Sequence, residues 1–124
     1  MRSYKELDVW QVAMSLAVTC YRVTRGFPRD ELYGLTSQIL RAATSIPANI
    51  AEGYGRETTK SYIQFLRIAQ GSLKELETHL TLAERVDVLV PVDAATLLGE
   101  CERVSKMLRN FIRALQAKIG SEPG

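Results

Sequence analysis

A heptad pattern of apolar residues between positions 62 and 83 places the tightest constraint on the fold of this chain. Apolar residues recur there at alternating steps of four and three for three repeats, which is typical of a helix that packs along one side against other helices. They are Tyr62, Leu66, Ala69, Leu73, Leu76, Leu80 and Ala83. A second seam with the same steps consists of Leu97, Cys101, Val104, Leu108, Phe111 and Leu115. Two seams of this kind in one short chain predict a bundle of helices.

Glycine and proline gather at a few points and leave four long stretches without a break. The breaks fall at residues 26–28, 53–58 and 86–91, so we expect helices over about 7–25, 29–52, 58–85 and 93–119. Because 124 residues suit one domain, we predict a single all-α domain over residues 1–119. Its expected form is an antiparallel up-down-up-down four-helix bundle. Residues 120–124 are expected to form a disordered tail.

The second expected helix contains a proline within its apolar face. Pro47 has no N–H to donate to the carbonyl of Ala43, and it disfavours the α conformation at Ile46. We therefore predict a kink at Pro47, and Gly53 and Gly55 are the natural end of the helix. The polar residues beside the kink, which we expect to satisfy the freed backbone groups, are Ser45, Asn49 and Glu52.

The first expected helix has too little polar surface for a helix on the outside of a lone bundle. Its polar positions form only a narrow stripe, whereas an outer helix normally carries a broad polar face. We therefore expect other copies of the chain to cover part of it. The candidate residues for this interface between copies are Val9, Trp10, Ala13, Met14, Ala17 and Tyr21.

The charge pattern offers one candidate binding surface. The net charge of +2 is too small to indicate a nucleic-acid-binding protein by itself. However, Lys60, Arg67 and Lys74 recur at spacing seven, so they line one side of the third helix. Such a line is usually a solvated face, but it can also bind phosphates. Together with Arg41 and Arg56 near the predicted kink, it forms the candidate nucleic-acid-binding set.

Motifs for catalysis or metal binding are missing from the sequence. The single histidine, His79, has no Glu-x-x-His pairing of the kind found in di-metal bundles, and no G-x-S-x-G element occurs. Cys20 and Cys101 lie far apart without a C-x-x-C pair, which favours buried free thiols. We expect no enzyme activity, cofactor or metal. Neither a signal peptide nor a membrane-spanning run is evident, so we expect a cytoplasmic protein without membrane contact.

Several blocks of the sequence resemble one bacterial family. They are LDVW at residues 7–10, FPRDELYGL at 27–35, QILRAA at 38–43, SIPANIAEG at 45–53 and AQGSLKELE at 69–77. These blocks are similar to those of four-helix-bundle proteins encoded by intervening sequences within 23S rRNA genes. The same family includes the accessory protein of diversity-generating retroelements. Its structural signature maps onto Ser45, Pro47, Asn49, Glu52 and Gly53. Where the family commonly has two consecutive arginines, this chain has Leu40 and Arg41.

The resemblance implies a homopentameric ring whose partners are RNA or DNA and, for the retroelement member, a reverse transcriptase. Our first hypothesis is therefore a non-catalytic oligomeric protein that binds nucleic acid through a basic surface repeated around the pentamer. Weak phosphate contacts from each subunit would then act together. The alternative is a structural or adaptor protein that binds a protein partner and has no affinity for nucleic acid.

Overall fold

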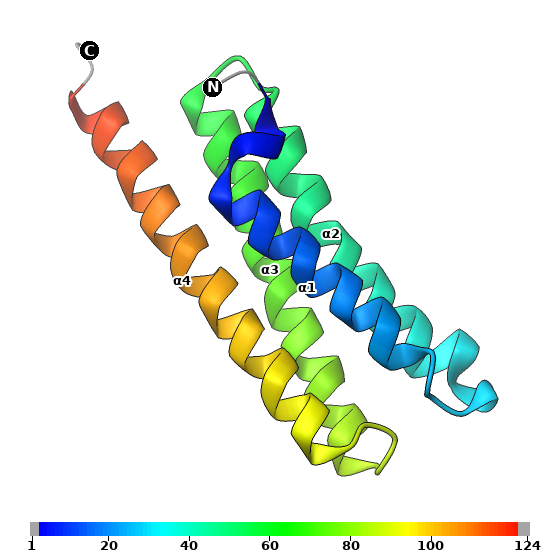
Figure 1. The fold of residues 1–124 in the computed structure, drawn as a ribbon. Coiled ribbons are helices and arrows are strands. Elements are labelled where there is room, and N and C mark those ends of the chain that lie inside the picture. Colours follow the sequence, from blue (N-terminus) through cyan, green and yellow to red (C-terminus); the bar gives the residue numbers. More distant parts are fainter. Residues whose placement is uncertain (1–2, 122–124) are drawn as a thin grey trace.

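Four α-helices account for most of the fold in a computed structural model of the protein, which describes residues 3–121 (Figure 1). The helices are α1 (Asp8–Thr24), α2 (Ser37–Tyr54), α3 (Thr59–Arg85) and α4 (Pro91–Ser121). A 3-10 turn, Tyr4–Glu6, precedes α1, and a 3-10 turn, Arg29–Glu31, leads through a π-helical turn, Leu32–Thr36, into α2. No residue from 3 to 121 is in a β-strand. The predicted all-α class with four helices is confirmed.

Each helix packs mainly against two others. α1 and α3 both contact α2 and α4. Figure 1 shows the connections after α1 and α3 at the lower end of the molecule and the connection after α2 at the upper end. The turn between α1 and α2 and the loop between α3 and α4 therefore lie at the same end of the molecule.

The ends of the helices follow local chemistry. The side chain of Thr58 accepts a hydrogen bond from the backbone N–H of Ser61 at 3.1 Å and so caps α3. α4 begins at Pro91, two residues before the predicted start at residue 93, because a proline in the first turn loses no helical hydrogen bond. It continues through Gly120 to Ser121, whereas residues 122–124 of the expected tail lie outside the described part of the chain.

The two heptad seams form the centre of the core. Six of the seven α3 positions are buried, and Tyr62 packs against them partly exposed. On α4 the seam is buried from Leu97 to Leu108, while Phe111 and Leu115 are partly buried. Cys20 and Cys101 are both buried free thiols. None of the helices in the described range has the length and apolar character needed to cross a membrane.

The backbone of the second helical segment is irregular at Gly34 rather than at Pro47. α2 continues without interruption across Pro47, which is buried. Gly34, in the π-helical turn, has φ −114° and ψ −111°, so the backbone departs from helical geometry there. A bend at Pro47 stays a prediction.

The core also takes up much of the apolar side of α1. Val9, Ala13 and Ala17 are buried within the subunit, which leaves little of their surface for a contact with another copy, and the predicted interface stays a prediction. Trp10 packs partly exposed against the core. Of the six expected interface residues, only Met14 and Tyr21 are exposed, and Val18 joins them on the surface. Small side chains on α1 thus serve its own packing against the bundle.

Candidate nucleic-acid interface

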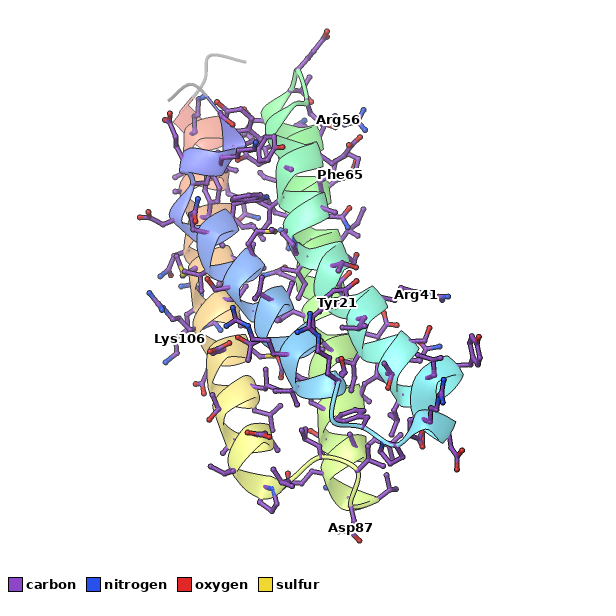
Figure 2. All side chains as sticks on the ribbon, turned by 45° about the vertical axis from the view of Figure 1, so that its right-hand side comes forward. Tyr21, Arg41, Arg56, Phe65, Asp87 and Lys106 are labelled. Carbon is purple, nitrogen blue, oxygen red and sulfur yellow. The ribbon has the colours of Figure 1, made fainter. Side chains whose placement is uncertain are left out.

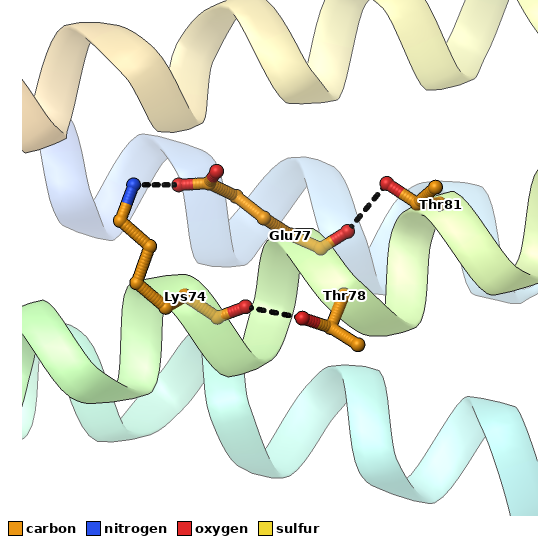
Figure 3. A network of polar contacts seen from close by, with 4 residues as sticks. All are labelled: Lys74, Glu77, Thr78 and Thr81. Carbon is orange, nitrogen blue, oxygen red and sulfur yellow. Dashed lines mark hydrogen bonds and ion pairs between the residues drawn. The ribbon is translucent and has the colours of Figure 1, made fainter.

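The predicted basic row lies exposed along α3. Lys60, Arg67 and Lys74 all face solvent, on the side of the helix away from the buried heptad seam. Lys74 Nζ lies 3.1 Å from Glu77 Oε1, so part of its charge is compensated (Figure 3). Lys60 and Arg67 have no ion pair with any residue in the described range. The row therefore offers two free cations and one paired cation per subunit.

The two arginines near the predicted kink differ in their freedom. Arg56 pairs with Glu52, and its guanidinium carbon lies 4.5 Å from the centroid of the Phe65 ring. Arg41 is exposed and has no ion pair within residues 3–121. Figure 2 shows Arg41 and Arg56 on the same side of the molecule, with Lys106 on the opposite side. Arg41 can bind an external anion directly, whereas Arg56 must first break its ion pair with Glu52.

The polar residues of the structural signature join α2 to α3. Ser45 Oγ lies 2.7 Å from Ser72 Oγ on α3. Asn49 Nδ2 donates to the carbonyl oxygen of Ser45 at 2.8 Å and to its Oγ at 3.0 Å. The amide of Asn49 therefore bonds the carbonyl of Ser45, not the carbonyl of Ala43 that Pro47 leaves unpaired. The hydrogen bond between Ser45 and Ser72 joins the two helices, and those from Asn49 hold Ser45 in place within α2.

Gly53 completes this joint between α2 and α3. It lies buried inside α2, which ends one residue later at Tyr54 and is followed by Gly55. A Cβ at Gly53 would lie 2.8 Å from Tyr62 Cδ1 and 2.9 Å from Phe65 Cβ. Gly53 therefore serves close approach of the two helices rather than helix termination. Gly71 also lies inside a helix, where a glycine suggests close approach to another helix. However, no neighbouring atom lies within 4 Å of its Cβ position, so no such approach occurs within the subunit.

Aromatic rings pack in a chain across one end of the bundle. Edge-to-face contacts run from Trp10 through Tyr4, Tyr54 and Tyr62 to Phe111, with ring centroids 5.4–6.5 Å apart. These rings touch all four helices and are held within the fold, as the helical spacing of the aromatic residues predicts. The hydroxyl of Tyr62 is buried without a hydrogen-bond partner. Burial, with a smaller contribution from Tyr54, raises the pKa of Tyr62 to about 12.

A second group of arginines was not predicted from the sequence. Arg25 and Arg29 line a pocket of about 310 Å³ where α1 ends and the chain turns into α2, beside Tyr21, Phe27 and Leu32. The two arginines lie on either side of the turn, so they belong to no helical period. Their spacing of four across Phe27 and Pro28 was the only signal in the sequence.

The structure offers little for metal chemistry. In the described range no three His, Cys, Asp or Glu side chains gather closely enough to hold a metal ion. His79 Nε2 lies 3.7 Å from Glu75 Oε1 on the same helix, and this nitrogen is buried without a hydrogen-bond partner. The two residues form a pair along one side of α3.

The buried thiols of Cys20 and Cys101 and the hydroxyl of Tyr62 should lower the stability of the fold at alkaline pH. Burial raises the pKa of both Cys20 and Cys101 to about 12 from an ordinary value of 9.0, and nearby Glu100 adds to both shifts. The folded state therefore keeps protons that the unfolded state loses above pH 9.0. We expect the free energy of unfolding to fall as pH rises from 9.0 towards 12. Urea unfolding at several pH values measures this fall.

A Cys20→Ala/Cys101→Ala variant serves as the control for this pH dependence. Its stability near neutral pH changes because two buried side chains are shortened, so the slopes against pH are compared rather than the absolute values. Without the thiols the slope should be shallower, leaving a contribution from Tyr62 above its ordinary pKa of 10.0. An unchanged slope in the variant would contradict the assignment to Cys20 and Cys101.

The fold and surface together define an all-α four-helix protein with a basic row on its third helix and a closely packed joint between its second and third helices. Its family follows from comparison with known proteins: the family model described as 23S rRNA-intervening sequence protein matches residues 5–110. The chain therefore belongs to the 23S rRNA-intervening sequence protein family, and the resemblance noted in the sequence is confirmed.

A solved structure shares this fold. It is the crystal structure of a protein with unknown function from the S23 ribosomal protein family of Bacteroides thetaiotaomicron VPI-5482. Its TM-score is 0.76 and its sequence identity 24%, and the match covers 84% of this chain and 97% of that one. No curated protein matches the chain.

Proposed function

We propose that the protein is a non-catalytic, oligomeric nucleic-acid-binding or accessory protein. The observation that carries this proposal is the exposed row of Lys60, Arg67 and Lys74 along α3. Residues seven apart on a helix are separated by about 10.5 Å along its axis, and phosphates along one strand of duplex DNA rise by about 3.4 Å each. The row thus reaches phosphates about three nucleotides apart. The family name, which refers to 23S rRNA, agrees with a nucleic-acid partner.

A ring of copies turns this small number of cations into a useful affinity. Three cations on one subunit neutralise few phosphates, so a single subunit binds weakly and loses affinity quickly with salt. A homopentamer repeats the row, so every contact after the first is made at high effective concentration. Arg41 and Arg56 extend the surface on α2. We further propose that the protein acts in the cytoplasm without a cofactor, and that a reverse transcriptase is a possible protein partner.

Charge reversal of the α3 row tests this function. In a Lys60→Glu/Arg67→Glu/Lys74→Glu variant, attraction to phosphate becomes repulsion, so affinity for a single-stranded RNA or DNA oligonucleotide should fall by roughly 100-fold or more at low salt. Fluorescence anisotropy against salt concentration gives the affinity. In the wild-type protein the logarithm of the affinity should fall linearly with the logarithm of salt, with a slope of about −0.7 for each phosphate contacted.

Lys106→Glu/Arg109→Glu/Arg113→Glu provides the matched control on α4. It changes the net charge equally, and Lys106 lies on the side of the molecule opposite to Arg41 and Arg56 (Figure 2). This variant should keep most of the affinity. Wild-type protein that binds no oligonucleotide at low salt, or binds it without salt dependence, would refute nucleic-acid binding. Equal losses in both variants would refute the α3 row as the site.

The alternative function is a structural or adaptor protein that binds a protein partner. The ion pairs of Lys74 with Glu77 and of Arg56 with Glu52 favour it, because both use up charge that a phosphate would need. Under this function the α3 charge reversal leaves partner binding largely intact, and no oligonucleotide is bound. The anisotropy measurement therefore separates the two functions.

A further inference from the structure

Two exposed apolar edges of the subunit lie at the same end of the bundle. The first, which we call the arginine corner, is the pocket lined by Tyr21, Arg25, Phe27, Arg29 and Leu32. Tyr21 also lines a neighbouring apolar groove of about 360 Å³ between α1 and α2, which contains Met14 and Val18. The corner is therefore the charged end of a longer apolar surface.

The second edge consists of the connection between α3 and α4 together with the first two residues of α4, and we call these residues, 86–92, the valine loop. Val86, Val90 and Val92 are 52%, 54% and 71% exposed. The loop nevertheless has a defined shape: Leu89 is buried, and the N–H groups of Val88 and Leu89 both donate to the carbonyl oxygen of Ala83, at 2.9 and 3.0 Å. The hydrogen-bonded backbone of the loop therefore holds the valine side chains in defined positions on the surface.

Asp87 gives the valine loop a negative charge at its tip. This residue has a positive φ of 62°, and Figure 2 shows it projecting from the lower end of the molecule. Glu84 and Asp93 flank the loop, and the one cation in residues 84–93 is Arg85. Asp87 has no ion pair within the described chain. An exposed apolar surface with an unpaired acid at its centre suits a basic apolar partner.

The arginine corner has the opposite charge. Arg25 and Arg29 are the charged residues that line the corner, whereas residues 84–93 contain three acids and one arginine. Arg25 and Arg29 have no ion pair among the residues that the structure describes. The corner and the valine loop thus match both in apolar character and in charge, and complementary charge selects partners and fixes their register.

The positions of the two edges agree with a ring. In Figure 1 both lie at the lower end, the corner between α1 and α2 and the loop between α3 and α4. Different surfaces that meet head to tail generate a ring when the rotation closes. If the axis runs along the helices, the surfaces must lie at the same height, as they do here.

We propose that the valine loop of one copy docks into the arginine corner of the next, with Asp87 beside Arg25 and Arg29 and the valines against Tyr21 and Leu32. The occupant of the corner is thus a second copy of this chain. Because it needs an assembly of several copies, this contact rests on the proposed function and assigns the surfaces that hold its ring together. The α3 row takes no part in the contact.

A charge swap tests the contact. Arg25→Glu/Arg29→Glu places acids opposite Asp87, and Asp87→Lys places a cation opposite the arginines, so each variant should assemble roughly 100-fold less tightly. Light scattering at micromolar protein should then give a mass near the 13.9 kDa of one subunit. Combining all three substitutions in one chain restores opposite charges and should restore the wild-type mass. Arg109→Glu/Arg113→Glu on α4 is the matched control and should keep that mass.

The results distinguish the proposed contact from a different interface between copies, from a monomeric protein and from a nucleic-acid site at the corner. Wild-type mass in all variants would overturn the contact and leave the oligomer of the proposed function standing. Monomeric wild-type protein would overturn the contact together with the ring. A corner variant that keeps the wild-type mass but loses affinity for a single-stranded oligonucleotide would overturn the contact and assign the corner to nucleic acid. Circular dichroism verifies that every variant is folded.

Discussion

Replacing Ala13 with aspartate should unfold the subunit at any protein concentration. Ala13 is 0% exposed and belongs to the core that α1 forms with the rest of the bundle. A carboxylate there has no partner, and burying an unpaired charge costs several kcal/mol. A domain of this size is typically stable by only about 5–15 kcal/mol. Circular dichroism should therefore detect loss of the cooperative thermal transition rather than a small shift of its midpoint.

Met14→Asp is the control for this prediction. Met14 is the next residue along α1 and is 36% exposed, so an aspartate at this position can remain in water. The variant should keep the fold, and any effect should fall on association between copies. An Ala13→Asp variant that stays folded and merely loses its oligomeric mass would contradict the structure, because Ala13 would then face a partner and not the core.

The fold was predictable from the sequence because a helix in a bundle repeats its apolar residues at a fixed period. The seams of α3 and α4 survive directly in the core, from Leu66 to Ala83 and from Leu97 to Leu108. The role of α1 was not predictable in the same way. Ala13 and Ala17 present the same pattern whether they pack against their own bundle or against another copy. Only the relative placement of α2 and α4 decides between the two.

In the candidate site, too, residues on one helix could be predicted from the sequence, whereas residues brought together by a turn could not. Periodicity alone placed Lys60 and Arg67 on one exposed row, because both lie on a single long helix. The pairing of Lys74 with Glu77, three residues on, was also readable from helical spacing. The arginine corner was not, because Arg25 and Arg29 come together through the turn at residues 26–28, which follows no helical period.

The structural roles of glycine and proline were the hardest to predict from the sequence. Pro47 suggested a break, yet α2 is continuous there and the irregular backbone lies at Gly34. Gly53 and Gly55 suggested a helix end, and Gly55 does cap α2, but Gly53 lies inside α2 against α3. Gly71 suggested a close approach, yet it borders open space. A glycine can serve backbone freedom or close packing, and only the neighbouring helix distinguishes these uses.

Replacing Gly53 with alanine should destabilise the protein even though alanine favours a helix. The added Cβ would lie 2.8 Å from Tyr62 Cδ1, 2.9 Å from Phe65 Cβ and 3.1 Å from the carbonyl oxygen of Tyr62. Phe65 Cβ and the carbonyl belong to the rigid part of α3, so the helices must separate. Overpacking of this kind costs about 1–3 kcal/mol, against a gain of up to about 1 kcal/mol from helix propensity. Urea unfolding should show a lower midpoint with an unchanged slope.

Gly71→Ala is the matched control, with the same chemical change at a position where nothing lies within 4 Å of the added Cβ. Only helix propensity acts there, so this variant should be more stable than the wild type by about 0.5–1 kcal/mol. Opposite signs for the two substitutions would establish that Gly53 is required by contact between α2 and α3 and not by its own backbone. A neutral Gly53→Ala would mean that the two helices lie further apart. A destabilising Gly71→Ala would mean that another copy of the chain packs on this face of α3.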